Sequence, residues 1–169
     1  MKVTIFNGSL RKDGDTAAAT SYLKELIAKA DADVNEYFLF HMNIKGCLTC
    51  GPGTGREKAA EMVRELASGD LVIIASPVYM YRPTDSVIAL LNVLHSMCRD
   101  DDGIADAVRG KRTAIILTGE EDAAAVAAGP LRQMCGSLGM NVIDPVAMIS
   151  AGVAECPETL RDLADKILQ

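Results

Sequence analysis

The residues best suited to chemistry lie in a loop between a short apolar run and the first amphipathic stretch of this 169-residue chain. The loop Asn7–Thr16 contains two hydroxyl residues, Ser9 and Thr16, and the basic residue Arg11. It leads into a helix, whose first backbone N–H groups have no intrahelical acceptor and carry partial positive charge. Hydroxyl, guanidinium and free amide donors together predict an anion site, typically for phosphate. An ordinary polar connection with a helix cap would use the same residues, so this loop alone leaves both interpretations open.

A second loop contains two of the few aromatic residues in the chain, which has three Phe, four Tyr and no Trp. The loop Ser76–Thr84 follows a continuous apolar run and includes Pro77, Tyr79 and Tyr81. A proline-stiffened backbone with apolar side chains and free amides suits a flat heteroaromatic ring that needs hydrogen bonds at its rim. Packing of the two tyrosines beneath a helix is the alternative interpretation.

Two cysteines share a third, glycine-rich loop. Cys47 and Cys50 are separated by two residues, a spacing found in redox dithiols, in half of a metal site, and by chance. An iron–sulfur cluster generally needs four thiolates, and residues 51–56 add none. We therefore predict no metal site and retain Cys47 and Cys50 as a candidate redox pair.

The same loop contains a rival motif. From Cys50 to Arg56 the chain fits Cys-x-x-Gly-x-x-Arg, which resembles the phosphate-cradling loop of protein tyrosine phosphatases. A thiolate nucleophile with an arginine on the phosphoryl group would be chemically coherent. However, Glu57 follows the arginine where a hydroxyl residue is usual, so a cysteine-dependent phosphatase is the lower alternative.

Short apolar runs alternate with amphipathic stretches along the chain. We predict five strands, at Lys2–Asn7, Val34–Phe40, Leu71–Ala75, Thr113–Leu117 and Met140–Met148. We predict five helices, at Ala17–Ala30 with Thr16 as its cap, Arg56–Ala67, Asp85–Cys98, Ala123–Leu138 and Glu158–Leu168, and a polar surface loop at Arg99–Arg109. This alternation is typical of an α/β fold with a parallel sheet between two helical layers.

The simplest such fold is a single domain over residues 1–169, with a five-stranded parallel sheet in the order 2-1-3-4-5. Ligands of such sheets bind at the carboxyl ends of the strands, around the switch point between the first and third strands. The loops Asn7–Thr16 and Ser76–Thr84 both follow strands that flank this point, so we expect them to form one site.

Taken together, these loops resemble a known family. The segment Gly8-Ser9-Leu10-Arg11, then Asp15-Thr16, and later Ala75–Tyr81 are similar to the NAD(P)H-dependent FMN reductases of the flavodoxin-like proteins. The Cys47–Cys50 segment resembles the branch that contains iron–sulfur flavoproteins, without the further cluster cysteines. The resemblance implies a flavodoxin-like three-layer sandwich and non-covalently bound FMN. It also implies hydride transfer from NAD(P)H to the flavin, with the electrons passed to an unidentified acceptor.

The resemblance also implies roles for individual residues. Ser9, Arg11 and Thr16 would hold the FMN phosphate, and Asp15 stands in the same loop where the family usually has Asn or Ser. The isoalloxazine would be lined by Pro77, Val78, Tyr79, Met80 and Tyr81, and a third flavin loop would be formed by Thr118 and Gly119. Because the flavin carries the chemistry, no catalytic side chain is required. A homodimer or homotetramer is expected, with Met80, Tyr81 and the helix Val87–Leu94 as candidate contacts.

Composition narrows the alternatives. The chain has 17 basic and 23 acidic residues and a formal charge of −6, which disfavours nucleic-acid partners. No apolar run approaches the roughly 18 residues of a membrane helix, and the first residues do not resemble a secretory signal. Five cysteines without such a signal predict a reduced, cytoplasmic protein. The expected partner is a small-molecule or protein electron acceptor, and an FMN-binding electron-transfer protein without catalytic activity is the alternative function.

Overall fold

The computed structural model describes residues 1–42, 55–150 and 157–169. The predicted redox pair, Cys47 and Cys50, lies outside these residues, and so does the cysteine of the phosphatase motif. The arginine of that motif, Arg56, lies at the start of a helix, but its side chain is outside what the structure describes.

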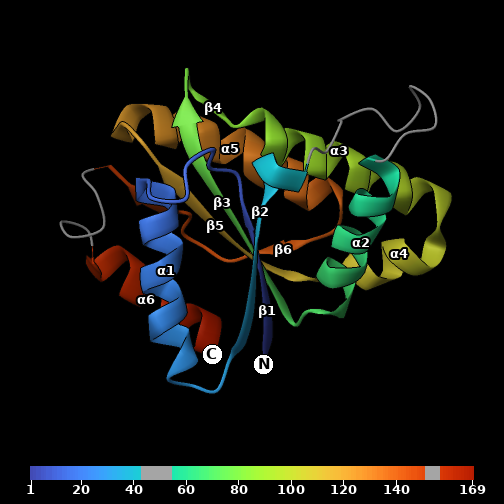
Figure 1. The fold of residues 1–169 in the computed structure, drawn as a ribbon, viewed down its shortest axis with the longest axis horizontal. Helices are drawn as coiled ribbons and strands as arrows, with labels where there is room; N and C mark the ends of the chain where they lie inside the picture. Colours follow the sequence, from blue (N-terminus) through green and yellow to red (C-terminus); the bar gives the residue numbers. More distant parts are fainter. Residues whose placement is uncertain (43–54, 151–156) are drawn as a thin grey trace.

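A parallel sheet forms the middle of the molecule (Figure 1). Its strands are β1 (Lys2–Asn7), β2 (Asp33–Phe38), β3 (Leu71–Tyr79), β5 (Arg112–Thr118), β6 (Asn141–Val142) and β7 (Ala147–Ile149), with β4 (Arg82–Pro83) antiparallel to β3. The order is β2-β1-β3-β5-β6, and β7 also pairs with β5. Every residue of β3 from Leu71 to Val78 is buried, as a central strand covered on both faces requires.

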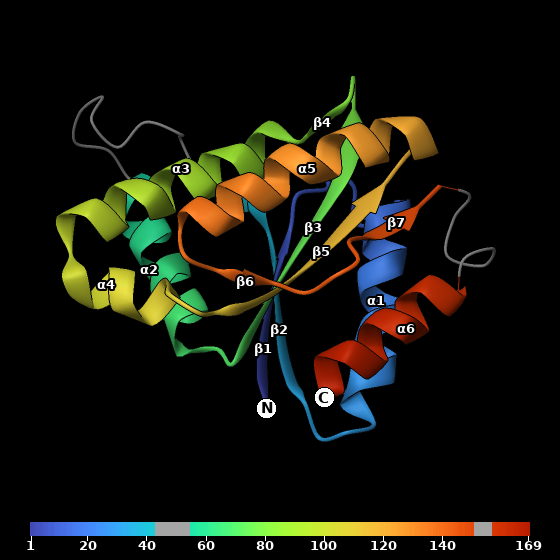
Figure 2. The ribbon, with the colours of Figure 1, turned by 180° about the vertical axis from the view of Figure 1, so that it is seen from behind.

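Helices cover both faces of this sheet. They are α1 (Asp15–Ala28), α2 (Gly55–Ser68), α3 (Asp85–Asp100), α4 (Asp102–Val108), α5 (Glu121–Ser137) and α6 (Pro157–Leu168), with a 3-10 turn, η1, at Leu39–Met42. The helices α1 and α6 pack together on one face, and the other four helices lie on the opposite face (Figures 1 and 2). Successive strand residues point to opposite faces, so Ile73 belongs to the α1–α6 core and Ile74 to the other core. The predicted α/β architecture with helices on both sides is confirmed.

Among the described residues, seven strands stand where we predicted five. Counting β5 as the fourth strand and the β6–β7 pair as the fifth, the order is still 2-1-3-4-5. The predicted strand Met140–Met148 is interrupted between Val142 and Ala147, where Pro145 has no N–H group to donate to a neighbouring strand. The strand β4 pairs with the end of β3 in a short hairpin and was not predicted.

Several predicted boundaries are wrong in ways that affect the site. Helix α1 begins at Asp15 with Gly14 as N-cap, whereas Thr16 was predicted as the cap. The strand β3 continues through Tyr79 instead of ending at Ala75, because Ser76 and Pro77 remain in register with Leu117 and Thr118 of β5.

Three further differences lie elsewhere in the chain. The strand β2 ends at Phe38, and Phe40 lies in η1 with an exposed ring. Helix α4 occupies the segment predicted as the surface loop Arg99–Arg109. Asp101 caps α4 by accepting hydrogen bonds from the N–H groups of Gly103 and Ile104. Val108 is fully buried and anchors this short helix to the core.

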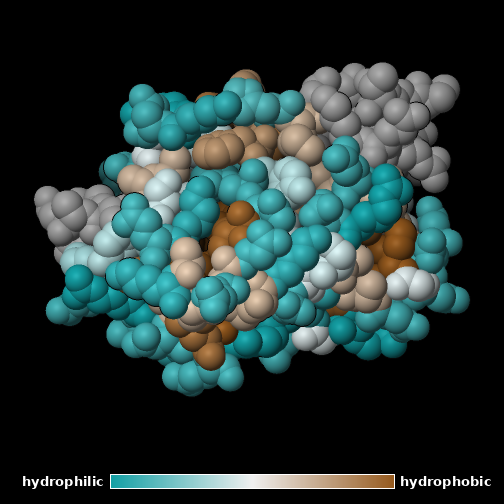
Figure 3. All heavy atoms as spheres, turned by 60° about the horizontal axis from the view of Figure 1, so that its bottom comes forward, coloured by the Kyte–Doolittle hydropathy of each residue, from teal (hydrophilic) through white to brown (hydrophobic). Residues whose placement is uncertain are grey.

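The end of the molecule opposite the strand carboxyl termini is polar. Figure 3 shows this face covered mostly by hydrophilic residues, with hydrophobic atoms in small separate patches. Of the helices within the described ranges, none is long and apolar enough to cross a membrane.

Candidate functional site

The predicted loops converge on one hollow at the carboxyl ends of β1, β3 and β5. It has a volume of about 120 Å³ and is lined by Ser9, Arg11, Gly14, Asp15, Thr16, Pro77, Val78, Tyr79, Thr118 and Gly119. All the predicted cofactor residues except Met80 and Tyr81 therefore lie together. Gly14 is the one lining residue that the sequence analysis did not select.

The N-terminus of α1 supplies donors to this hollow. Its N-cap is Gly14, which has no side chain to accept a hydrogen bond from the first-turn amides. Those N–H groups have no intrahelical acceptor, and the helix dipole adds positive potential around them. The Arg11 side chain is largely exposed, and its Nε lies 3.7 Å from Asp13 Oδ1, an ion pair that contributes little in water. The guanidinium therefore remains available to an anion in the hollow.

Hydrogen bonds hold the first loop in a defined shape. Ser9 Oγ accepts a hydrogen bond from the Arg11 N–H at 3.1 Å and donates one to the Arg11 carbonyl at 2.8 Å. The Gly8 N–H donates to the Ala75 carbonyl of β3 at 2.8 Å. In this conformation the Ser9 hydroxyl braces the loop, so a direct bond from it to phosphate requires the bond to the Arg11 carbonyl to break.

A pair of threonine hydroxyls joins the first loop to the end of β5. Thr16 Oγ1 and Thr118 Oγ1 lie 2.6 Å apart, and both residues are almost fully buried. Each hydroxyl can donate one hydrogen bond and still accept another. The pair therefore fixes the spacing between two walls of the hollow, although the two residues are 102 positions apart in the chain.

The third wall is mostly backbone. Gly119 has a φ of +144°, a conformation that L side chains rarely adopt, and a Cβ placed there would lie 3.2 Å from the Val78 carbonyl oxygen. Its N–H donates to the Ile149 carbonyl of β7 at 3.1 Å. Glycine therefore lets the ends of β3 and β5 approach closely without a side chain between them.

The remaining two predicted residues form the tip of the β3–β4 hairpin. Met80 has a φ of +50° and Tyr81 a φ of +63°, and their side chains are 87% and 54% exposed. Two central residues with positive φ make a type I′ turn, which normally contains Asn and Gly. Neither residue lines the hollow.

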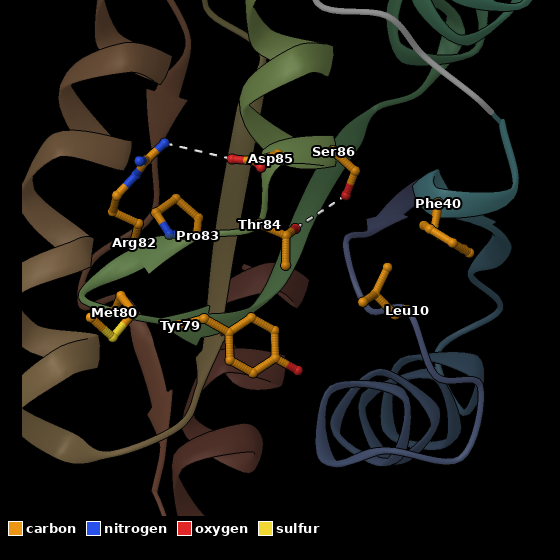
Figure 4. Close-up of a pocket in the computed structure, with 9 residues that line it drawn as sticks. All are labelled: Leu10, Phe40, Tyr79, Met80, Arg82, Pro83, Thr84, Asp85 and Ser86. Atoms are coloured by element: carbon orange, nitrogen blue, oxygen red, sulfur yellow. Dashed lines mark hydrogen bonds and ion pairs between the residues drawn. The ribbon is translucent and has the colours of Figure 1, made fainter.

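A larger groove lies beside the hollow and shares Tyr79 with it. It has a volume of about 430 Å³ and is lined by Leu10, Phe40, Tyr79, Met80, Arg82, Pro83, Thr84, Asp85 and Ser86. Figure 4 shows the Tyr79 ring directed from the end of β3 toward Leu10, with Phe40 close to Leu10 and Thr84 bonded to Ser86 above. Leu10 and Phe40 were not predicted as site residues, because the motif that contains Leu10 assigns its side chain no role and Phe40 lies in no motif.

A largely buried carboxylate, with 9% of its side chain exposed, lies behind the first loop. Glu36 of β2 accepts hydrogen bonds from Asn7 Nδ2 at 2.9 Å, Thr20 Oγ1 at 2.7 Å and Lys24 Nζ at 2.5 Å. Burial raises the pKa of Glu36, but these hydrogen bonds and the charge of Lys24 outweigh burial and lower the pKa below its ordinary value. The sequence analysis missed this cluster; its available signals were the Thr20–Lys24 helical spacing and a glutamate in a strand next to β1.

Acidic residues near the hollow lie at the starts of helices. Glu120 is the N-cap residue of α5, and Glu121 and Asp122 occupy its first turn, where negative charge is favourable to the helix dipole. Asp15 has the same position in α1 but also lines the hollow. Within the described residues, no three His, Cys, Asp or Glu side chains gather as a metal site would require.

Comparison with known proteins decides the family. A family model described as NADPH-dependent FMN reductase matches residues 1–154. The chain belongs to this family. It is an FMN-binding, NAD(P)H-dependent oxidoreductase with FMN as its cofactor and NAD(P)H as its electron donor. No protein among the curated sequences matches the chain.

Solved structures show the same fold at low sequence identity. An NADH:FMN oxidoreductase in its apo form is 20% identical, with a TM-score of 0.74 over 99% of this chain and 88% of its own. The flavoenzyme NAD(P)H:(acceptor) oxidoreductase from Paracoccus denitrificans is 16% identical, with a TM-score of 0.74 over 99% and 94%. A flavodoxin from the domain Archaea is 18% identical, with a TM-score of 0.61 over the full length of both chains. These likenesses confirm the predicted flavodoxin-like fold.

The residues of the hollow fit the cofactor of the family. A phosphate needs several N–H, O–H or guanidinium donors, and the Gly14-capped helix start, Thr16 and Arg11 supply them. A flat ring needs a surface without a protruding side chain, and Gly119 provides one beside the Val78 backbone. When bound, FMN would accept the hydride and pass the electrons on, so the surrounding side chains need only bind and orient it.

Proposed function

We propose that this oxidoreductase holds the FMN phosphate at the start of α1 and the isoalloxazine over the ends of β3 and β5. The observation that carries the proposal is the hollow shared by Arg11 and Thr16 with Val78 and Gly119. Ser9 and Asp15 lie at the phosphate end, and Pro77, Tyr79 and Thr118 complete the ring site. The walls are joined by the Thr16–Thr118 hydrogen bond, so the two halves of the site have a fixed separation before the cofactor binds.

The role of each group follows from its position. Arg11 and the first-turn amides of α1 neutralise and orient the phosphate, and Thr16 donates to it while Thr118 keeps its hydroxyl in place. The ring lies over the closely approaching ends of β3 and β5, where Gly119 has no side chain beside the Val78 backbone. Tyr79 is 57% exposed and stands between the hollow and the neighbouring groove, which makes it a wall that a nicotinamide or an acceptor contacts.

The phosphate site can be tested by comparing FMN with riboflavin, which lacks the phosphate. Apo-protein is titrated with each flavin, and the quenching of flavin fluorescence gives both dissociation constants. We expect R11M to weaken FMN binding by about tenfold, as loss of one charge-assisted hydrogen bond predicts, with riboflavin binding unchanged. R82M is the matched control, because Arg82 is similarly exposed but lines the groove instead of the hollow. Equal loss for FMN in R11M and R82M, or equal loss for both flavins in R11M, would contradict the proposal.

Turnover separates a reductase from an electron-transfer protein. The FMN-loaded protein is titrated anaerobically with NADPH and then, in a second sample, with NADH. Bleaching of the bound flavin by either nucleotide, at a rate that supports turnover, is the expected result. Flavin that binds but is reduced by neither nucleotide would support the non-catalytic alternative.

We also infer that two or more copies of the chain assemble through the β3–β4 hairpin. Met80 and Tyr81 are exposed at its tip and continuous with the apolar groove that contains Leu10 and Phe40. The apolar side chains of the predicted contact helix, Val87–Leu94, are buried in the core of the chain except for the half-buried Ile88, so the hairpin offers the larger exposed apolar surface. Light scattering at micromolar concentration tests this: a dimer or tetramer that M80S/Y81S converts to monomer supports it, and a monomeric unchanged chain refutes it.

The surfaces beside the site fit two classes of electron acceptor, and the cysteines bear on the compartment. The exposed apolar groove suits a planar small molecule, and the exposed hairpin suits a protein acceptor. The free thiols of Cys98 and Cys135 support a reducing, cytoplasmic location. Turnover assays with quinones and with an electron-transfer protein in parallel distinguish the two acceptor classes.

A further inference from the structure

A chain of hydrogen bonds between polar side chains, which we call the relay, lies beneath the loop that lines the hollow. It begins at Glu36, whose carboxylate is bonded by Thr20 and Lys24 of α1 and by Asn7, the last residue of β1, and none of these four residues lines the hollow itself. Asn7 is fully buried. Its Oδ1 accepts the Ser9 N–H at 2.9 Å, so the amide connects the carboxylate to the loop.

The charge of Glu36 determines which way the Asn7 amide points. An ionised carboxylate only accepts hydrogen bonds, so the NH₂ group of Asn7 must face it. A flipped amide would place two oxygens 2.9 Å apart in a buried site. Because the NH₂ group faces Glu36, Oδ1 necessarily faces the Ser9 N–H.

The relay continues into the anion loop. The Ser9 N–H is held by Asn7, and the Ser9 hydroxyl in turn holds both the N–H and the carbonyl of Arg11. The backbone from β1 to Arg11 is thus fixed by consecutive side-chain bonds that end at a charged group. A loop already ordered in this way loses less conformational entropy when it binds a ligand.

We propose that Asn7 and Glu36 are positioning residues for the phosphate of the cofactor, acting through the Ser9–Arg11 turn. The proposal rests on the proposed function of the hollow. Neither residue touches the ligand: Glu36 orients the Asn7 amide, and Asn7 sets the turn that presents Arg11 and leads into the start of α1.

A pair of exchanged residues tests the relay. In N7D, one carboxylate oxygen still accepts from Ser9, but the other faces Glu36 and repels it, so we expect FMN binding to weaken by about tenfold or more. In N7D/E36Q, the amide introduced at position 36 can donate to the carboxylate introduced at position 7, and we expect affinity to return to within about threefold of the unchanged chain. The net charge of the double variant equals that of the unchanged chain, while its carboxylate is closer to the phosphate. Recovery therefore reports geometry and not long-range repulsion.

Two further measurements distinguish loss of the relay from a general loss of stability and from a failure to bind FMN. T113V is the control for stability, because Thr113 is equally buried but bonds Lys111 near the amino end of β5. It should lower the unfolding midpoint without changing FMN affinity. Amide hydrogen exchange at Ser9 and Arg11 is the ligand-free readout, and we expect faster exchange in N7D and recovery in N7D/E36Q.

The outcomes are distinct. Unchanged FMN affinity in N7D, or a double variant as weak as N7D, overturns the relay while leaving the FMN site intact. If the unchanged chain does not bind FMN, the proposed function fails together with the assigned ligand. Hydrogen exchange then still decides whether Asn7 and Glu36 hold the turn.

Discussion

Gly8 offers the sharpest test of how tightly the first loop is packed. Its backbone φ is not in the left-handed region, so alanine could adopt the same conformation. Space is the constraint: a Cβ placed on Gly8 would lie 2.5 Å from Thr84 Oγ1 and 2.6 Å from Val87 Cγ2. Val87 is fully buried at the start of α3, and Thr84 is bonded to Ser76 and Ser86.

The size of the effect follows from these contacts. Ordinary Cβ contacts begin near 3.4 Å, so α3 and the loop must separate by roughly 0.8 Å, which a close-packed interior resists. We expect G8A to lower the free energy of unfolding by about 2 kcal/mol, within the usual range for overpacking. For a chain of this length that corresponds to a fall in Tm of about 4–8 °C.

Urea unfolding of G8A and of a matched glycine variant gives the measurement. Gly136 lies in α5 with open space around the position that a Cβ would occupy, so G136A should stabilise the protein by up to about 1 kcal/mol through helix propensity. The same chemical change thus has opposite signs at the two positions. A G8A midpoint within about 0.5 kcal/mol of the unchanged chain, at an unchanged m-value, would refute the packing argument.

Three other predictions follow from buried polar groups. Because the pKa of Glu36 is lowered on folding, its contribution to stability is present above the ordinary value of 4.5 and lost as pH falls through the folded pKa; the stability gap between the unchanged chain and E36Q should therefore close on acidification, and a gap constant with pH in urea titrations would contradict this. T118V leaves the buried Thr16 hydroxyl without its partner and should lower the free energy of unfolding by about 1–3 kcal/mol. An unchanged free energy of unfolding in calorimetry would show that this hydrogen bond does not stabilise the fold. Burial raises the pKa of Cys135 to about 12, so peptide mapping after iodoacetamide should find it alkylated only on unfolding; labelling of the folded protein at the rate of the half-buried Cys98 would refute the burial argument.

Sequence patterns predicted the α/β architecture because both of its signals are local. Continuous apolar runs such as Leu71–Ala75 can only be covered on two faces, and the intervening amphipathic stretches supply the cover. The convergence of Ser9, Thr16 and Thr118 was also predictable, since the carboxyl ends of parallel strands meet at one edge. Boundaries were less predictable: the extension of β3 to Tyr79 depends on pairing with β5, which no local pattern reports.

Parts of the site could not be predicted because they depend on distant contacts. The bond between Asn7 and Glu36 requires β1 and β2 to pair in one specific register, with Ile5 opposite Glu36. The groove beside Tyr79 depends on Phe40 leaving β2 for a 3-10 turn, and the propensity of the segment favoured a longer strand. The acidic segment Glu120–Asp122 lies at the start of α5, where its charge is favourable to the helix dipole, and its place depends on where β5 ends.

The hairpin tip has a consequence for engineering the protein. A type I′ turn with Met80 and Tyr81 at positive φ costs about 1–3 kcal/mol per residue relative to a turn built from residues that prefer this conformation. A redesign for stability would therefore replace these two residues with Asn-Gly. It would thereby remove the exposed side chains of Met80 and Tyr81 from the surface at the carboxyl ends of the strands. Where Met80 and Tyr81 contact another copy of the chain, the redesign would raise thermal stability and weaken assembly. A library screened for heat resistance alone would discard the surface that our assembly proposal requires.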